Sequence, residues 1–151
     1  MYEITPYLFL GDYHDAENNI CINQVNCTKD LPRFNHKSKK FYRVPVNDDL
    51  QEYSFKEMTQ EFPGAVEFIR ECVDSSERVL VHCHAGQQRS CAVIAAYFAS
   101  MGVPIEKSVE YLRSRKPDAF KNGVNFQKSL YEYVTALAPV PSVIEPAPVA
   151  L

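Results

Sequence analysis

Residues 78–99 read RVLVHCHAGQQRSCAVIAAYFA, and a polar loop separates two apolar runs in this stretch. Residues 78–82 form a short, β-branched run that is typical of a strand buried on both faces of a sheet. Residues 91–99 are apolar almost all round, which predicts a central, buried helix. A buried strand that leads into a buried helix indicates an α/β fold, in which ligands bind beyond the carboxyl ends of the strands. The polar loop, residues 82–90, occupies that place.

The remainder of the chain alternates between strand and helix patterns. Further strands are predicted over residues 7–10, 20–25 and 41–46, and helices over residues 54–73, 105–116 and 126–137. Ser54 and Glu57 have the spacing of a capping box at the start of the first of these helices. Pro63 and Gly64 interrupt the same helix, which is therefore expected as two pieces or as one helix with a sharp break.

These elements predict a single compact α/β domain over residues 1–138. Its central, mostly parallel sheet of four to five strands is expected to be covered by helices on both faces. Residues 139–151 contain four prolines and predict an extended tail. This tail is a candidate for contact with a partner or with a second copy of the chain. The basic cluster at residues 36–40 is either a solvated loop or a patch that docks the substrate.

Length, charge and cysteine usage exclude several classes of protein. The chain has 151 residues, which is enough for one domain. It has 16 Lys and Arg residues against 19 Asp and Glu residues, and the resulting net charge of −3 argues against a dedicated nucleic-acid binder. No apolar run approaches the roughly 20 residues that span a bilayer, and no secretory signal is visible, so an intracellular, cytoplasmic protein is expected. The five scattered cysteines suit neither a disulfide framework nor a metal site, and no cofactor is expected. Four of them are interpreted as small buried side chains.

The fifth, Cys83, lies in a loop that is suited to bind phosphate. A loop between a strand end and a helix start points successive N–H groups inward and forms a nest for an anion. Gly86 permits the backbone conformation that such a curl demands. Arg89, six residues after Cys83, offers a planar fork that holds two phosphate oxygens. The same groups favour the thiolate form of Cys83, which is therefore predicted to be a nucleophile aimed at phosphorus.

The His-Cys-(five residues)-Arg-Ser loop resembles that of the cysteine-based protein tyrosine phosphatase superfamily. Three further segments are similar to the dual-specificity branch: residues 4–11 to its opening strand and turn, residues 44–48 to the segment of its general acid, and Asn125, Phe126 and Leu130 to its closing helix. The resemblance covers roughly residues 2–135. The Ala-Gly-x-Gln-Arg-Ser variant of the loop is similar to loops in members from large DNA viruses, which act in a host cell.

This resemblance implies a role for each residue of the site. Cys83 attacks the phosphoryl group, and Ser90 eases the departure of its sulfur. Asp48 is the general acid, with the adjacent Asp49 as the alternative.

His82 orients the loop and tunes the thiolate, unless it is only a buried strand histidine. The phosphate oxygens are bound by Arg89 and by the backbone N–H groups of the loop, which comprises His84, Ala85, Gly86, Gln87, Gln88 and Arg89. The amides of Gln87 and Gln88 either position water or substrate or are solvated side chains.

The function implied is that of a dual-specificity protein phosphatase, a signalling hydrolase acting on phosphoprotein substrates. It would hydrolyse phosphotyrosine and phosphoserine or phosphothreonine monoesters through a phosphocysteine intermediate. One alternative is an RNA 5′-triphosphatase or another non-protein phosphatase, such as a lipid phosphatase, of the same superfamily. The loop disfavours these readings, because its variable positions carry no permanent charge and hold Ala85 and Gln88 where RNA triphosphatases carry His and Asn. A second alternative is a catalytically weak module that binds phosphorylated residues, although Cys83 and Arg89 are both present.

Overall fold

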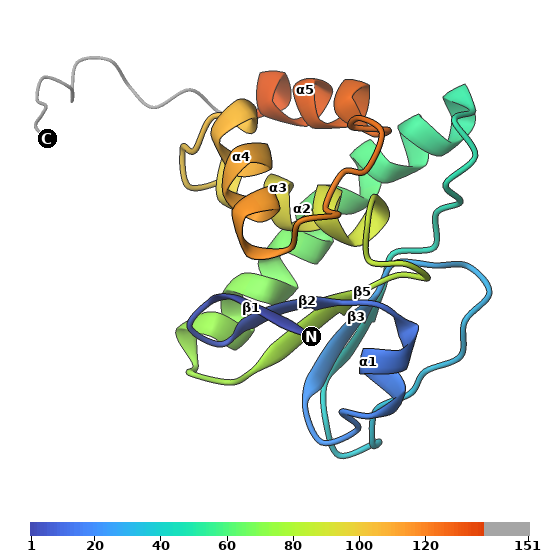
Figure 1. Ribbon diagram of the computed structural model, residues 1–151, viewed down its shortest axis with the longest axis vertical. Helices are drawn as coiled ribbons and strands as arrows, with labels where there is room; N and C mark the ends of the chain where they lie inside the picture. Colours follow the sequence, from blue (N-terminus) through green and yellow to red (C-terminus); the bar gives the residue numbers. More distant parts are fainter. Residues whose placement is uncertain (138–151) are drawn as a thin grey trace, which may run out of the picture.

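The computed structural model describes residues 1–137, which form one sheet and five helices (Figure 1). The strands are β1 (Tyr2–Thr5), β2 (Leu8–Gly11), β3 (Asn23–Asn26), β4 (Phe41–Arg43) and β5 (Val79–His82). The helices are α1 (Tyr13–Glu17), α2 (Glu52–Asp74), α3 (Arg89–Ala99), α4 (Ile105–Arg115) and α5 (Gln127–Ala136). The predicted domain boundary after residue 138 and the predicted tail, residues 139–151, lie outside the described residues.

The five strands form a single sheet in the order β1-β2-β5-β3-β4. Only β1 is antiparallel to its neighbour, and the other pairs are parallel. The predicted α/β domain with a mostly parallel sheet is therefore confirmed. Because β5 lies in the centre, with β2 on one side and β3 on the other, its carboxyl end meets the loop at residues 83–88 in the middle of the sheet edge.

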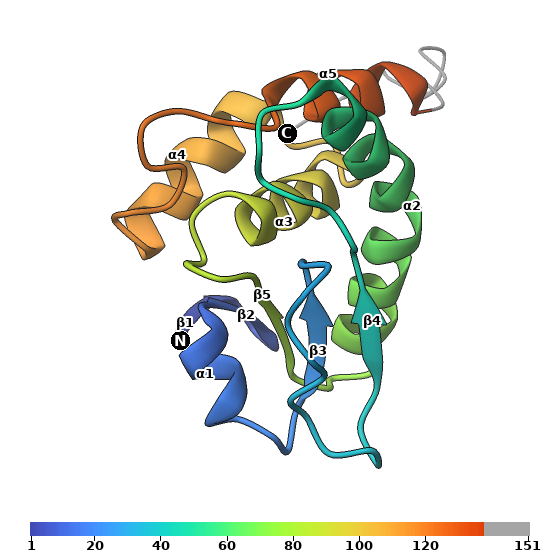
Figure 2. The same cartoon turned by 90° about the vertical axis from the view of Figure 1, so that its right-hand side faces the viewer.

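Helices cover the two faces of the sheet very unevenly. On one face α2, α3, α4 and α5 build a thick layer, whereas the short α1 lies against the other face (Figures 1 and 2). Alternate side chains of β5 reflect this division. Val79 and Val81 belong to the main core beneath the four helices, and Leu80 belongs to a smaller cluster with Ala16 and Ile22.

The central helix predicted after the loop is α3, and every one of its residues is buried. It packs against α2, α4 and α5, which surround it on the same face of the sheet. Burial on all sides explains why this segment has no polar stripe, and it fixes the first turn of α3 rigidly beneath the loop. Among residues 1–137, none of the helices combines the length and the apolarity that crossing a bilayer requires.

Helix α2 differs from the prediction in two ways. It begins at Glu52, after Gln51, so the capping box predicted at Ser54 is wrong and Ser54 instead lies buried inside the helix. It also continues through Pro63, so the predicted break is wrong. Pro63 lies on the exposed side, while Phe62 and Val66 hold the helix against the core. This packing outweighs the loss of one backbone hydrogen bond.

Two predicted strands are shorter than their patterns, and one short helix was not predicted. The strand expected over residues 20–25 begins at Asn23, and the strand expected over residues 41–46 ends at Arg43. Helix α1 follows a capping box in which Asp12 accepts from the Asp15 N–H and Asp15 accepts from the Asp12 N–H. Aspartates at this spacing were the signal that could have revealed the helix.

Candidate active site

Cys83 follows the last residue of β5 and lies at the base of the loop. Its side chain is buried, with 3% of its surface exposed. The Sγ atom lies 3.2 Å from the Oγ atom of Ser90, which belongs to the first turn of α3. Strand and helix thus bring together the two side chains that the sequence paired as nucleophile and sulfur partner. A hydroxyl at this distance can donate a hydrogen bond to a thiolate.

Arg89 ties the loop to the segment that carries the candidate acid. Its Nη1 atom donates to the carbonyl oxygen of Val46 over 3.0 Å, and the residue is almost fully buried. Its Nε–H group is also buried, and within residues 1–137 it has no hydrogen-bond partner. A buried guanidinium donor without a partner is costly unless a ligand accepts from it. This arrangement suits the binding of an oxyanion at the loop.

The turn between β2 and α1 supports the loop from the other side, a contribution that the sequence did not reveal. Gly86 has a φ of +69°, and a Cβ atom on it would lie 2.6 Å from the carbonyl oxygen of Gly11. The Tyr13 N–H donates to the carbonyl oxygen of His84 over 3.2 Å. The loop therefore has its curl imposed by a neighbouring backbone, and only glycine fits at position 86.

His84 lies at the rim of the loop, where it meets a residue that the sequence analysis missed. Its Nε2 atom is 3.1 Å from both carboxylate oxygens of Asp30. The hydrogen bond from His84 lowers the pKa of Asp30. The rim thus carries an imidazole with a carboxylate beside it, while Ala85 is exposed next to them.

The two candidate acids have different surroundings. Both oxygens of Asp49 accept hydrogen bonds, Oδ1 from the Gln51 N–H over 3.1 Å and Oδ2 from the Tyr53 hydroxyl over 2.8 Å. The neighbouring hydroxyls of Ser54 and Tyr53 lower the pKa of Asp49. Asp48 is exposed, and its Oδ1 atom accepts from the Nδ2–H of Asn125 over 2.9 Å. Asp49 is thereby engaged at the start of α2, which favours Asp48 as the acid.

Gln88 is not a solvated loop side chain, so that interpretation is wrong for this residue. It is buried, with 7% of its surface exposed. Its Nε2 atom donates to the carbonyl oxygens of Lys121 and Gly123, and its Oε1 atom accepts from the Asn125 N–H. Gln87 reaches the same region, since its Nε2 atom donates to Asp118 over 3.0 Å. Both amides therefore join the loop to the segment that precedes α5.

His82 is fully buried behind the loop, on the face of the sheet that α1 covers. Its ring lies 5.9 Å from that of Phe34, and within residues 1–137 neither ring nitrogen has a hydrogen-bond partner. Burial lowers the pKa of His82 to about 4. The imidazole is therefore neutral near pH 7. Its predicted effect on the thiolate stays a prediction.

The remaining cysteines have no comparable surroundings. Burial raises the pKa of Cys91 to about 12 and raises that of Cys27 as well. Cys72 is also buried, but Cys21 is exposed, so the expectation of a buried side chain is wrong there. Across the described part of the chain, no three His, Cys, Asp or Glu side chains lie close enough together to hold a metal ion.

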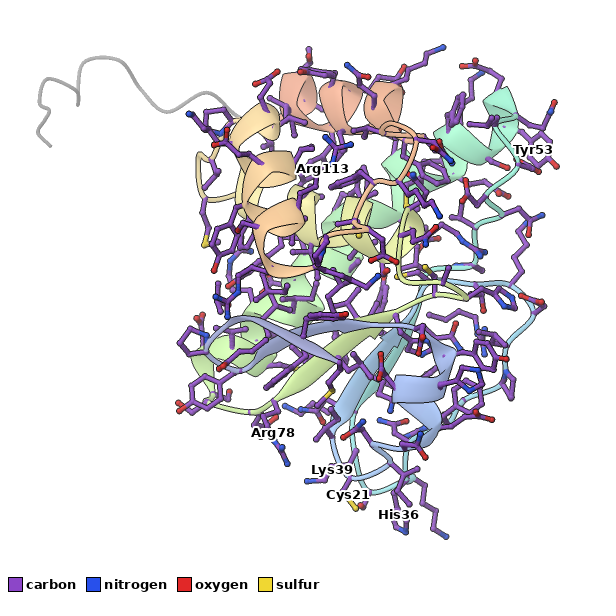
Figure 3. All side chains as sticks on the ribbon, viewed as in Figure 1. Cys21, His36, Lys39, Tyr53, Arg78 and Arg113 are labelled. Carbon is purple, nitrogen blue, oxygen red and sulfur yellow. The ribbon has the colours of Figure 1, made fainter. Side chains whose placement is uncertain are left out.

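The basic cluster lies far from this site. Figure 3 shows His36 and Lys39 at the lower end of the molecule, together with Cys21 and Arg78. Arg78 precedes the first residue of β5, whereas Cys83 follows the last one, so the cluster and the loop lie at opposite ends of this strand. A substrate that reached both would have to extend along the whole strand.

Comparison with known proteins agrees with this geometry. The chain matches the family model described as dual specificity phosphatase, catalytic domain, over residues 8–136. It is 34% identical over 145 residues to dual specificity protein phosphatase Mpk3 of Drosophila melanogaster, and the alignment covers 89% of this chain and 34% of the fly protein. It is 30% identical over 142 residues to human dual specificity protein phosphatase 8, and this alignment covers 89% of this chain and 22% of the human protein. The crystal structure of human DUSP28 superposes with a TM-score of 0.73 and 26% identity, covering 90% of this chain and 96% of that one.

The match includes every part of the site described above. The chain spans between 21% and 36% of the length of the curated relatives it matches. The residues that match the family model, 8–136, include the loop after β5, the segment of Asp48 and the segment of Asn125. The family model covers most of the residues that the structure describes, and it agrees with the resemblance that the loop sequence indicated. The chain therefore belongs to the dual specificity phosphatase family.

Proposed function

We propose that this chain is a cysteine-dependent protein phosphatase that hydrolyses phosphotyrosine and phosphoserine or phosphothreonine monoesters. One observation carries the proposal. Cys83 and Arg89 lie at the two ends of one loop at the carboxyl edge of the sheet. The Ser90 Oγ atom is 3.2 Å from the Cys83 sulfur, and the buried Nε–H group of Arg89 has no hydrogen-bond partner among the described residues. These groups together form a nucleophile within an oxyanion site.

In the first step the Cys83 sulfur forms a bond to phosphorus while the bond from phosphorus to the ester oxygen breaks. Asp48 gives its proton to the departing oxygen, so the product leaves as a neutral alcohol or phenol. Arg89 and the N–H groups of residues 84–89 bind the three equatorial oxygens, whose charge is spread in the transition state. The enzyme then carries a phosphocysteine.

In the second step Asp48, now ionised, removes a proton from water. The water oxygen forms a bond to phosphorus, the sulfur–phosphorus bond breaks, and its electron pair returns to the Cys83 sulfur. The Ser90 hydroxyl stabilises this sulfur by donating a hydrogen bond, for which its position 3.2 Å away is suitable. Inorganic phosphate is released, and both Asp48 and the thiolate are restored to their starting states.

The substrate class rests on the relatives. The fly and human relatives are named as dual specificity protein phosphatases, and the match to them includes the loop and the acid segment. We therefore propose phosphoproteins as the substrates. A reducing, intracellular compartment suits the reaction, because the nucleophile works only as a free thiolate.

The test measures phosphate release by the purified chain from phosphotyrosine and phosphothreonine peptides and from RNA that carries a 5′-triphosphate. Turnover of both peptides is expected, and Cys83→Ser should abolish it. Cys21→Ser is the matched control, since it changes an exposed thiol at the other end of the molecule. Faster release from the RNA would overturn the proposed substrate, and phosphopeptide binding without turnover would overturn the proposed reaction.

A further inference from the structure

The Gln88 side chain connects the phosphate loop to the segment before α5 through three hydrogen bonds. It donates to the carbonyl oxygens of Lys121 and Gly123 over 2.9 and 2.8 Å, and it accepts from the Asn125 N–H over 3.0 Å. The side chain is buried, and the three bonds are themselves partly buried. The hydrogen-bonding atoms of one amide are thus spent on the backbone of a single segment, residues 121–125.

This segment depends on such anchors. Phe120, Asn122 and Gly123 all have positive φ angles, a conformation that costs free energy for the two residues with side chains. Arg113 of α4 holds the preceding residues by donating to the carbonyl oxygens of Ala119 and Phe120. Gln88 is the corresponding anchor on the side of the active site.

Asn125 carries the effect onward to the candidate acid. Its backbone N–H is bound by Gln88, and its side-chain amide donates to Asp48 Oδ1 over 2.9 Å. Because Oδ1 accepts a hydrogen bond from this amide, Oδ2 is the oxygen that carries the proton which Asp48 delivers. Asp48 is exposed, and a single hydrogen bond of this kind restricts the rotamers that an exposed carboxylate samples.

We propose that Gln88 is a positioning residue for the general acid, and that it acts through Asn125. The inference rests on the proposed function, because it assigns to Gln88 the placement of Asp48 over the ester oxygen. Gln88 thereby couples the two halves of the site: its backbone belongs to the loop that binds phosphate, and its side chain sets the position of the group that protonates the leaving oxygen.

The experiment compares two substrates with different leaving groups, phenyl phosphate and p-nitrophenyl phosphate. Only the poorer phenolate leaving group needs the proton. Gln88→Met, which keeps the volume of the side chain and removes its hydrogen bonds, should lower kcat on phenyl phosphate at least tenfold and change kcat on p-nitrophenyl phosphate less than threefold. Asn125→Ala should show the same pattern. Gln127→Ala, an exposed amide two residues further on, is the matched control and should change neither value.

Two further measurements separate positioning from a structural role. In an Asp48→Ala background, Gln88→Met should bring no additional loss on phenyl phosphate, because the acid it positions is absent. The affinity for vanadate, which reports on the phosphate loop, should stay within about threefold of that of the parent chain.

An equal loss on both substrates, or a loss of vanadate affinity, would show that Gln88 shapes the phosphate loop and would overturn the inference. If Gln88→Met does not fold, Gln88→Asn, whose amide is one methylene too short to keep all three bonds, makes the same comparison for Gln88, and Asn125→Ala with its Asp48→Ala double variant tests the onward link to Asp48 at a partly exposed residue. A parent chain that turns over neither substrate would overturn the proposed function itself, which is a distinguishable result.

Discussion

At the scale of single residues, the adjacent carboxylates Asp48 and Asp49 have separate roles. A general acid must hold a proton before it can deliver one, and it needs an oxygen that faces the substrate. Asp49 accepts a hydrogen bond on each of its oxygens, and the hydroxyls of Ser54 and Tyr53 lower its pKa. It therefore stays ionised and engaged at the start of α2. Asp48 uses Oδ1 alone for Asn125.

Replacing each carboxylate in turn tests this division of roles. Asp48→Ala should reduce kcat on phenyl phosphate about a hundredfold or more, in the range typical of general acid catalysis, and reduce kcat on p-nitrophenyl phosphate far less. Asp49→Ala should affect the two substrates equally and lower the free energy of unfolding slightly, because it removes the hydrogen bonds from the Gln51 N–H and the Tyr53 hydroxyl. Steady-state kinetics on both substrates checks this, and a larger selective loss for Asp49→Ala would transfer the role.

At the scale of secondary-structure elements, the sequence predicted best where local pattern and packing agree. The β-branched run of β5 and the wholly apolar α3 were both predicted, because burial on every side leaves no other place for them. Helix α2 passes through Pro63 because its buried face outweighs a local cost, and no local pattern records that balance. The Gln88 contacts are missed for the same reason, since they join segments more than 30 residues apart in the chain.

The contact between the phosphate loop and the β2–α1 turn gives a prediction at this scale. Gly86→Ala places a Cβ atom 2.6 Å from the Gly11 carbonyl oxygen at a φ of +69°. We expect the free energy of unfolding to fall by about 2 kcal/mol or more, through a positive φ and a backbone overlap together. Gly102→Ala, at a φ of +90° with no atom within 4 Å of the new Cβ, is the control and bears only the conformational cost of about 1 kcal/mol.

Urea unfolding compares the stabilities of the two variants, and vanadate inhibition reports on the loop. Gly86→Ala should weaken vanadate binding, because the loop must move away from the Gly11 backbone and its N–H groups then no longer point at one anion. Equal stabilities for Gly86→Ala and Gly102→Ala, with vanadate affinity retained in both, would mean that the turn does not impose the curl of the loop.

At the scale of the whole molecule, a neutral histidine buried behind the sheet links stability to pH. Burial lowers the pKa of His82 to about 4, whereas the unfolded chain carries an ordinary histidine with a pKa near 6.5. Between these values the unfolded chain binds more protons than the folded one. The stability that His82 contributes is therefore complete above about pH 6.5 and is lost progressively as the pH falls toward 4.

Urea unfolding at pH 7.5 and pH 5.0 measures this contribution, which linkage sets at about 2 kcal/mol over that interval. Carboxylates whose pKa is lowered, such as Asp30 and Asp118, lose their contribution mainly at lower pH. In His82→Leu the difference between the two pH values should shrink by about that amount, because neither ring nitrogen has a described partner to lose. His36→Gln changes an exposed imidazole and should leave the difference intact. An unchanged pH dependence in His82→Leu would mean that the folded domain admits the charged imidazole, and hence that water or a rearranged backbone reaches the space behind Cys83.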